Sequence, residues 1–238
     1  MINANEMWDK LSKYLKVDKA LEQGFSTGKY TKILASYAKE VVAIDLSEYF
    51  FDIAAENLKD YDNVEIKLMD AKKMPFSDKS FDVLLNTSFH EFDLSGDVYS
   101  VDLDLKREIL KEMIRVSDTI VFVEPTSEAV TNELFKVFNP VENHKDRIIQ
   151  SNNLIDKVME EEGYDLIETG FSYNEHPFET IKDLEESVIT WWDDIKVPKD
   201  EEEKKQMISQ IDDILEKAGM LDTLNVIEKV QYRVYRNS

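Results

Sequence analysis

Apolar side chains along this chain follow two kinds of spacing. Short apolar or alternating runs, the pattern of strands, occur at 17–23, 41–44, 63–69, 81–85, 119–123, 164–173 and 226–236. Other segments repeat apolar residues every third or fourth position, the pattern of amphipathic helices, at 5–15, 30–37, 47–58, 103–116, 127–138 and 151–162. Strands that alternate with helices in this way predict a parallel sheet covered by helices.

An acidic stretch between the last two predicted strands carries two more helical patterns, at 181–195 and 208–218. We interpret residues 174–220 as a helical lid insertion, residues 1–16 as an N-terminal helix flap or a helix packed on the sheet edge, and residues 1–238 as a single domain. Four aromatic residues either wall an acceptor pocket under the lid or belong to the core or a dimer surface: Phe138, Phe178, Trp191 and Trp192.

A turn with two glycines separates the first predicted strand from its helix. The segment 24–28, GFSTG, lacks the G-x-G-x-x-G spacing of a dinucleotide site, and no Ser or Thr follows Lys29 as a phosphate-binding P-loop requires. The turn therefore allows close backbone approach of a ligand that presents no phosphate there. Asp45, at the end of the second strand, is placed to accept hydrogen bonds from ribose hydroxyls.

Composition narrows the possible partners. The 50 acidic and 29 basic residues give a formal charge of −21, which disfavours nucleic acid as a substrate. The absence of cysteine excludes disulfides, thiolate catalysis and thiolate metal sites. We expect no membrane association, because no apolar stretch approaches the roughly 20 residues of a transmembrane helix. The N-terminus has no signal-peptide pattern, so a cytoplasmic location is expected.

Three sequence motifs resemble those of the class I S-adenosylmethionine-dependent methyltransferases, most closely the methyltransferase type 11-like branch that acts on small molecules. The first, acid-x-G-x-G-x-G, is matched with serine in place of the middle glycine by Glu22, Gly24, Ser26 and Gly28. The second is a strand-end acid followed by an apolar residue, here Asp45 and Leu46. The third begins with Asp70 and Ala71 and continues as D-A-x-x-M-P-F-x-D-x-S-F-D through residue 82.

This resemblance covers residues 17–125 and implies a fold, a cofactor and binding roles. The fold is an α/β, Rossmann-like, seven-stranded, mostly parallel sheet with an antiparallel last strand, helices on both faces and a helical insertion between strands six and seven. The cofactor is S-adenosyl-L-methionine. By the resemblance, Leu46 packs on the adenine, Asp70 accepts from the adenine amino group, and Asn86 and Thr87 line the methionine side.

His90 and Glu91, just after the fourth strand, are the candidate catalytic residues. A histidine at this point could take a proton from an acceptor hydroxyl or amine. The alternative is that both residues begin the next helix and pack against the sheet. His144 and His176 are weaker candidates, which we expect in loops. No trio of carboxylates suited to a metal follows the fourth strand, so we predict no metal.

These observations favour an enzyme that transfers a methyl group from S-adenosylmethionine to a small-molecule acceptor by in-line displacement. Two alternatives stay open. Ser26 in place of glycine is compatible with a non-catalytic protein that binds S-adenosylmethionine, and the acceptor could be a protein. We expect no nucleic acid or membrane partner, and a homodimer is possible.

Overall fold

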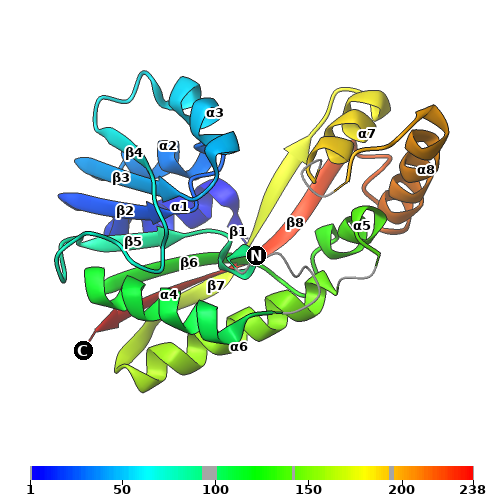
Figure 1. Ribbon diagram of the computed structural model, residues 1–238. Helices are drawn as coiled ribbons and strands as arrows, with labels where there is room; N and C mark the ends of the chain where they lie inside the picture. The colour runs from blue at the N-terminus through cyan, green and yellow to red at the C-terminus, as the bar shows by residue number, and fades with distance from the viewer. Residues whose placement is uncertain (1, 93–100, 141–142, 193–195, 238) are drawn as a thin grey trace.

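The computed structural model of the protein describes residues 2–92, 101–140, 143–192 and 196–237. Its centre is one eight-stranded sheet with the order β1-β7-β8-β6-β5-β2-β3-β4 (Figure 1). The strands are β1 (Ile2–Asn3), β2 (Lys19–Gln23), β3 (Glu40–Asp45), β4 (Val64–Leu68), β5 (Val83–Asn86), β6 (Thr119–Pro125), β7 (Tyr164–Pro177) and β8 (Asn225–Asn237).

The strand directions confirm the predicted topology. β2 pairs in parallel with both β3 and β5, β3 with β4, and β5 with β6. β8 lies antiparallel between β6 and β7. Seven of the strands were predicted from sequence. The eighth, β1, pairs in parallel with β7 over two residues, too few to carry an alternation pattern.

Helices cover both faces of the sheet. α1 (Ala4–Leu15) and α2 (Lys29–Ala35) pack on one face, where Leu11 and Leu34 meet Val83 and Val121 in a common apolar cluster. α4 (Leu103–Val116) and α6 (His144–Glu161) pack on the other face. α3 (Glu48–Leu58) contacts β3 and β4. The predicted flap, 1–16, therefore includes a helix packed on the sheet, and its role as a flap stays a prediction.

Several helix and strand boundaries differ from the sequence-based ones. α6 begins at His144, seven residues before the predicted start at 151, and the side chain of Asn143 caps it by accepting from the Asp146 amide. The polar residues of this first turn conceal the helical spacing. α5 (Thr131–Phe138) begins four residues later than predicted, and β7 continues to Pro177.

The insertion between β7 and β8 contains α7 (Ile181–Thr190) and α8 (Glu201–Lys217). Both helices pack beside α5 at the far end of the long β7–β8 pair, as Figure 1 shows. Trp191, Trp192 and Phe178 pack against this helical cluster, and Phe138 is buried within it. The first predicted helix of the insertion extends to 195, but residues 193–195 lie outside the described part of the chain. Across the described residues, every helix is too short or too polar to span a bilayer.

Candidate functional site

The motif residues lie at the carboxyl ends of neighbouring strands. Gly24 follows β2, Asp45 ends β3, Asp70 follows β4 and Asn86 ends β5. β3 and β4 lie on one side of β2, and β5 and β6 lie on the other, so the strand order reverses at β2. In open α/β sheets, ligands bind outside the carboxyl ends of the strands at such a point.

The turn after β2 has a left-handed backbone at alternate residues. The φ angles are 81° at Gly24, 46° at Ser26 and 84° at Gly28. A Cβ atom on Gly28 would lie 3.0 Å from Leu58, so both its conformation and its packing require glycine. Ser26 takes the left-handed conformation despite its side chain, at a cost of about 1–2 kcal/mol. Ser26, which replaces the middle glycine of the motif, thus still adopts a conformation that favours glycine.

Asp45 connects this turn to β3. Its Oδ2 accepts from the Ser26 amide at 2.9 Å, and its Oδ1 accepts from the Ser47 amide at 2.9 Å. Each oxygen keeps a second lone pair that can accept from a hydroxyl. The next residue, Leu46, is 72% exposed. A carboxylate with spare acceptor capacity beside an uncovered apolar side chain fits a ligand with both hydroxyls and an apolar ring.

Helix α4 holds the third motif, residues 70–82, in place. Arg115 of α4 donates to the carbonyl oxygens of Met74 at 2.9 Å and Phe76 at 2.7 Å. Glu112 accepts from the Met74 amide at 2.7 Å. Asp70 uses Oδ1 to accept from the Lys72 amide at 2.9 Å, and its side chain is 45% exposed. The motif therefore has a structural function in its middle and leaves the carboxylate at its start accessible.

Two polar residues of the strand ends are fully buried. Neither carboxylate oxygen of Glu22 forms a hydrogen bond of normal geometry with a described residue. Burial raises the pKa of Glu22 from 4.5 to about 8; the nearby Thr31 hydroxyl opposes the change and the Asp45 charge adds to it. Asn86 donates from Nδ2 to the Gln23 carbonyl at 3.4 Å, while Thr87 next to it is 7% exposed. Ala71 is half-buried and packs against the cluster on the α4 face.

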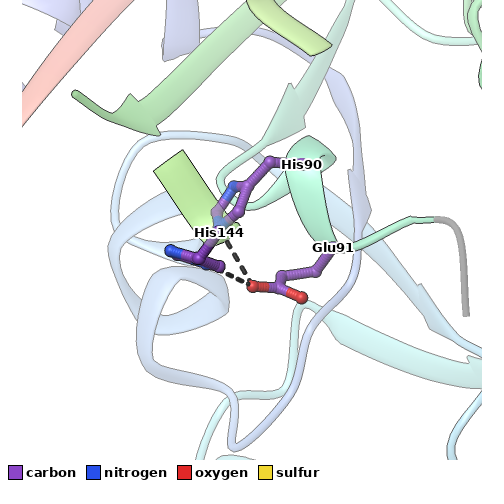
Figure 2. Close-up of side chains that lie close together, drawn as sticks. All are labelled: His90, Glu91 and His144. Carbon is purple, nitrogen blue, oxygen red and sulfur yellow. Dashed lines mark hydrogen bonds and ion pairs between the residues drawn. The ribbon is translucent and has the colours of Figure 1, made fainter. Parts of the chain in front are cut away.

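His90 and Glu91 form the short 3-10 helix η1 (Phe89–Glu91) after β5, and they contact the first residue of α6 (Figure 2). His90 lies 2.7 Å through Nδ1 from Glu124 Oε2 and 3.1 Å through Nε2 from Glu91 Oε1. His144 lies 3.0 Å through Nε2 from the same Glu91 oxygen. Both rings are buried. The alternative that these residues pack against the sheet is therefore also compatible with their positions.

The charges of this cluster depend on one another. Burial lowers the pKa of His90, but the carboxylates of Glu124 and Glu91 outweigh burial and raise it to about 10. Burial raises the pKa of Glu91, but His90 and His144 outweigh this and hold it well below its usual range. In this structure neither ring nitrogen of His90 faces an open position from which it could take a proton.

One member of the cluster, His144, was a weaker candidate from the sequence with its position predicted wrongly, and two others were not identified at all. His144 lies in α6 and not in a loop, and it is 4% exposed. Glu124 in β6 is fully buried, and its only sequence signal is an acid at the end of an apolar strand. Lys106 of α4 donates to the carbonyls of Phe89 at 2.7 Å and His90 at 2.9 Å. These residues lie far apart in sequence, so spacing could not connect them.

Comparison with known proteins finds a family model that matches part of the chain and solved structures with a similar fold. Residues 21–118 match the family model of a methyltransferase domain. A candidate methyltransferase from Bacillus halodurans has a similar structure, with a TM-score of 0.62 and 18% identity, covering 98% of each chain. The YcgJ protein of Bacillus subtilis aligns with a TM-score of 0.60 and 14% identity over 98% of this chain and 99% of that chain.

A third solved structure is the N-methyltransferase NodS from Bradyrhizobium japonicum, with a TM-score of 0.53 and 12% identity over 98% of this chain and 96% of that chain. A search of curated proteins finds no significant match. The structural similarities establish the fold, and the family model covers the motifs at the ends of β2 to β5. Residues 21–118 therefore match a methyltransferase domain family, and the chain has a Rossmann-like fold similar to that of the methyltransferases among these solved structures.

Proposed function

We propose that the protein transfers a methyl group from S-adenosylmethionine to a small-molecule acceptor. The observation that carries the proposal is the convergence of the left-handed turn after β2 with Asp45 and Asp70 at one edge of the sheet. A matching family model supports the reaction, and the exposed Leu46 beside a carboxylate supports the cofactor. Bound S-adenosylmethionine supplies a methyl group activated by its sulfonium charge.

The chain's own residues provide binding and orientation in this proposal. The turn at Gly24, Ser26 and Gly28 offers backbone at close range, and Asp45 accepts from the ribose hydroxyls. Leu46 and Ala71 pack on the adenine, and Asp70 accepts from its amino group. Buried Glu22, with Asn86 and Thr87, lines the side where the cationic amino acid portion would lie; a cation there would favour the ionised form of this buried carboxyl group.

Methyl transfer requires mainly proximity and alignment, so a general base is not a condition of the proposal. His90 and Glu91 stay predicted catalytic residues. Proton transfer by His90 would require its Nε2 to leave Glu91 Oε1, 3.1 Å away in this structure.

The acceptor class rests on charge and on the surroundings of the insertion. A formal charge of −21 disfavours nucleic acid. Beside the paired strands β7 and β8, Asn174 donates to the Tyr30 hydroxyl at 3.2 Å and to Glu228 at 3.3 Å, and Thr131 donates to Glu228 at 3.0 Å. A half-buried carboxylate in such a polar group suits a small polar acceptor. A groove of about 920 Å³ between α5 and the β7–β8 pair is lined by none of the predicted cofactor residues.

Calorimetry with S-adenosylmethionine and S-adenosylhomocysteine tests the cofactor assignment. We expect both to bind, and we expect Asp45→Ala to lose at least about tenfold in affinity because each lost hydrogen bond to a charged group is worth about 1.5–3 kcal/mol. Asp60→Ala, at an exposed position after α3, is the matched control. Equal affinities of wild type and Asp45→Ala would refute the ribose assignment.

Transfer of a labelled methyl group tests the acceptor class. The wild-type protein is incubated with labelled S-adenosylmethionine and with pools of small amines, phenols, thiols and carboxylates, and in parallel with a cell protein extract. Label in the small-molecule fraction alone supports the proposal. Label in protein indicates a protein-modifying enzyme, and cofactor binding without transfer to any pool indicates the non-catalytic alternative.

A further inference from the structure

Three metal-binding atoms converge beside the carboxyl ends of β5 and β6. His90 Nε2 and His144 Nε2 lie 3.1 and 3.0 Å from one atom, Glu91 Oε1, and all three lie within 4.8 Å of one another (Figure 2). His90 and Glu91 come from η1, and His144 comes from the start of α6. Ligands at 2.0–2.1 Å from a tetrahedral zinc ion lie about 3.3 Å apart, close to two of these separations.

The hydrogen bonds around His144 determine which of its ring nitrogens carries a proton. Both hydrogens of the Asn132 amide are used, because its Nδ2 donates to the carbonyls of Thr126 at 3.0 Å and Ala129 at 3.0 Å. Its Oδ1 therefore faces His144 Nδ1, 2.9 Å away, and accepts from it. In a neutral ring the lone pair then lies on Nε2, which faces Glu91.

The same reasoning holds for His90. Glu124 accepts from the Phe89 amide at 2.5 Å and the His90 amide at 3.2 Å, and His90 Nδ1 lies 2.7 Å from its Oε2. A carboxylate only accepts, so His90 Nδ1 donates and its Nε2 carries the lone pair in the neutral ring. When both rings are neutral, three lone pairs thus point at one another, and this arrangement requires either a metal ion or added protons between them.

We propose that His90 Nε2, His144 Nε2 and Glu91 Oε1 bind one divalent transition-metal ion of the zinc type. Two imidazoles and one carboxylate form a donor set of zinc sites, whereas Mg²⁺ and Ca²⁺ prefer oxygen ligands. Arg147 lies 3.2 Å from Glu91 Oε2, so the carboxylate offers its other oxygen alone. The site joins η1 to α6 and leaves room in a tetrahedral ion for a fourth ligand.

The surroundings of the three ligands match those of known metal sites. A metal-bound histidine almost always donates its second ring N–H to a carboxylate or carbonyl oxygen, which orients the ring. Glu124 has this function for His90, and Asn132 has it for His144. The sequence-based expectation of no metal rested on the lack of a carboxylate trio after the fourth strand. Here two of the three ligands are histidines, and His144 lies 53 residues from Glu91. The inference does not rest on the proposed function, although His90 and Glu91 are also its predicted catalytic residues.

Zinc titration of chelator-treated protein at constant pH, followed by calorimetry, tests the site. The wild-type protein is expected to bind one equivalent of Zn²⁺ with micromolar or tighter affinity, and Mg²⁺ is expected not to displace it. Glu91→Gln and His144→Gln are each expected to lose this equivalent. Asn132→Leu, which removes the acceptor that orients His144, is expected to weaken binding by about 10–100-fold.

The chain offers a matched control, because it has three histidines and no cysteine. His176 lies in β7, with its ring 5.2 Å from Trp191, so His176→Gln should keep the full equivalent. Far-UV circular dichroism checks that each variant is folded, and the visible spectrum of Co²⁺-loaded wild type reports nitrogen coordination without any variant. The proposal is overturned if the wild type binds no equivalent, or if Glu91→Gln, His144→Gln and His176→Gln bind Zn²⁺ alike. Either result would mean that hydrogen bonds, and not a metal ion, hold the cluster together.

Discussion

Replacing Glu22 with glutamine tests the consequence of burying an ionisable carboxyl group at the end of β2. Both oxygens of Glu22 are buried at the end of β2, and burial raises the pKa of this group from 4.5 to about 8. In the unfolded chain the same group ionises near its ordinary pKa. Between these two values the native state holds a proton that the unfolded state has lost, so this group makes stability fall as pH rises.

The size of the effect follows from the shift. One pKa unit corresponds to about 1.4 kcal/mol, so Glu22 lowers the free energy of unfolding by roughly 2–3 kcal/mol between pH 5 and pH 7, and by up to about 5 kcal/mol at pH 9. Glu22→Gln removes this dependence because the amide does not ionise. A buried amide without partners costs about 1–3 kcal/mol, but that cost is the same at every pH. The free energies of unfolding of wild type and Glu22→Gln, plotted against pH, should therefore converge or cross as pH rises.

Urea denaturation of wild type and Glu22→Gln at pH 5, 7 and 9, without cofactor, measures this difference. Glu216→Gln, at an exposed position of α8, controls for the loss of one charge from a chain with a formal charge of −21. The expected result is a wild-type free energy that falls with pH relative to Glu22→Gln by several kcal/mol, while Glu216→Gln follows the wild type. Parallel curves for Glu22→Gln and wild type would show that Glu22 ionises normally in the native state, and the burial argument would fail.

Two further predictions concern the turn after β2 and the third motif. Gly28→Ala forces a Cβ atom into a left-handed conformation at φ 84° and to within 3.0 Å of Leu58, so we expect a loss of about 2–4 kcal/mol in urea denaturation. At Gly163, φ is 78° and an added Cβ would have no neighbour within 4 Å, so Gly163→Ala should lose about 1 kcal/mol. Equal losses in Gly28→Ala and Gly163→Ala would show that the Leu58 contact contributes nothing. Arg115→Lys gives up the multiple donors that hold Met74 and Phe76, so we expect a loss of about 1–3 kcal/mol and faster amide hydrogen exchange at 70–80. Arg107→Lys, whose partner Glu161 is at the surface, should change neither quantity, and unchanged exchange at 70–80 in Arg115→Lys would contradict the structural role of that motif.

Local patterns in the sequence were sufficient for the sheet and for the positions of its strand ends. Apolar runs such as 81–85 and 119–123 have no stable alternative to burial, and alternation with helices requires parallel pairing. Because parallel strands end at one edge, Gly24, Asp45 and Asp70 were predicted to lie near one another before their coordinates were known. The boundaries of α6 and β7 were predicted less well, because polar residues conceal the spacing at their ends.

The sequence by itself determined which elements form and which residues follow each strand, because periodicity and turn chemistry act between residues a few positions apart. Only the tertiary structure decided that both carboxyl oxygens of Glu22 are buried, that Ser26 takes a left-handed conformation, and that His144 meets Glu91 from 53 residues away. Burial and side-chain convergence depend on which helix covers which face of the sheet. That packing is set by the apolar contacts of the whole chain, and no short segment of sequence contains it.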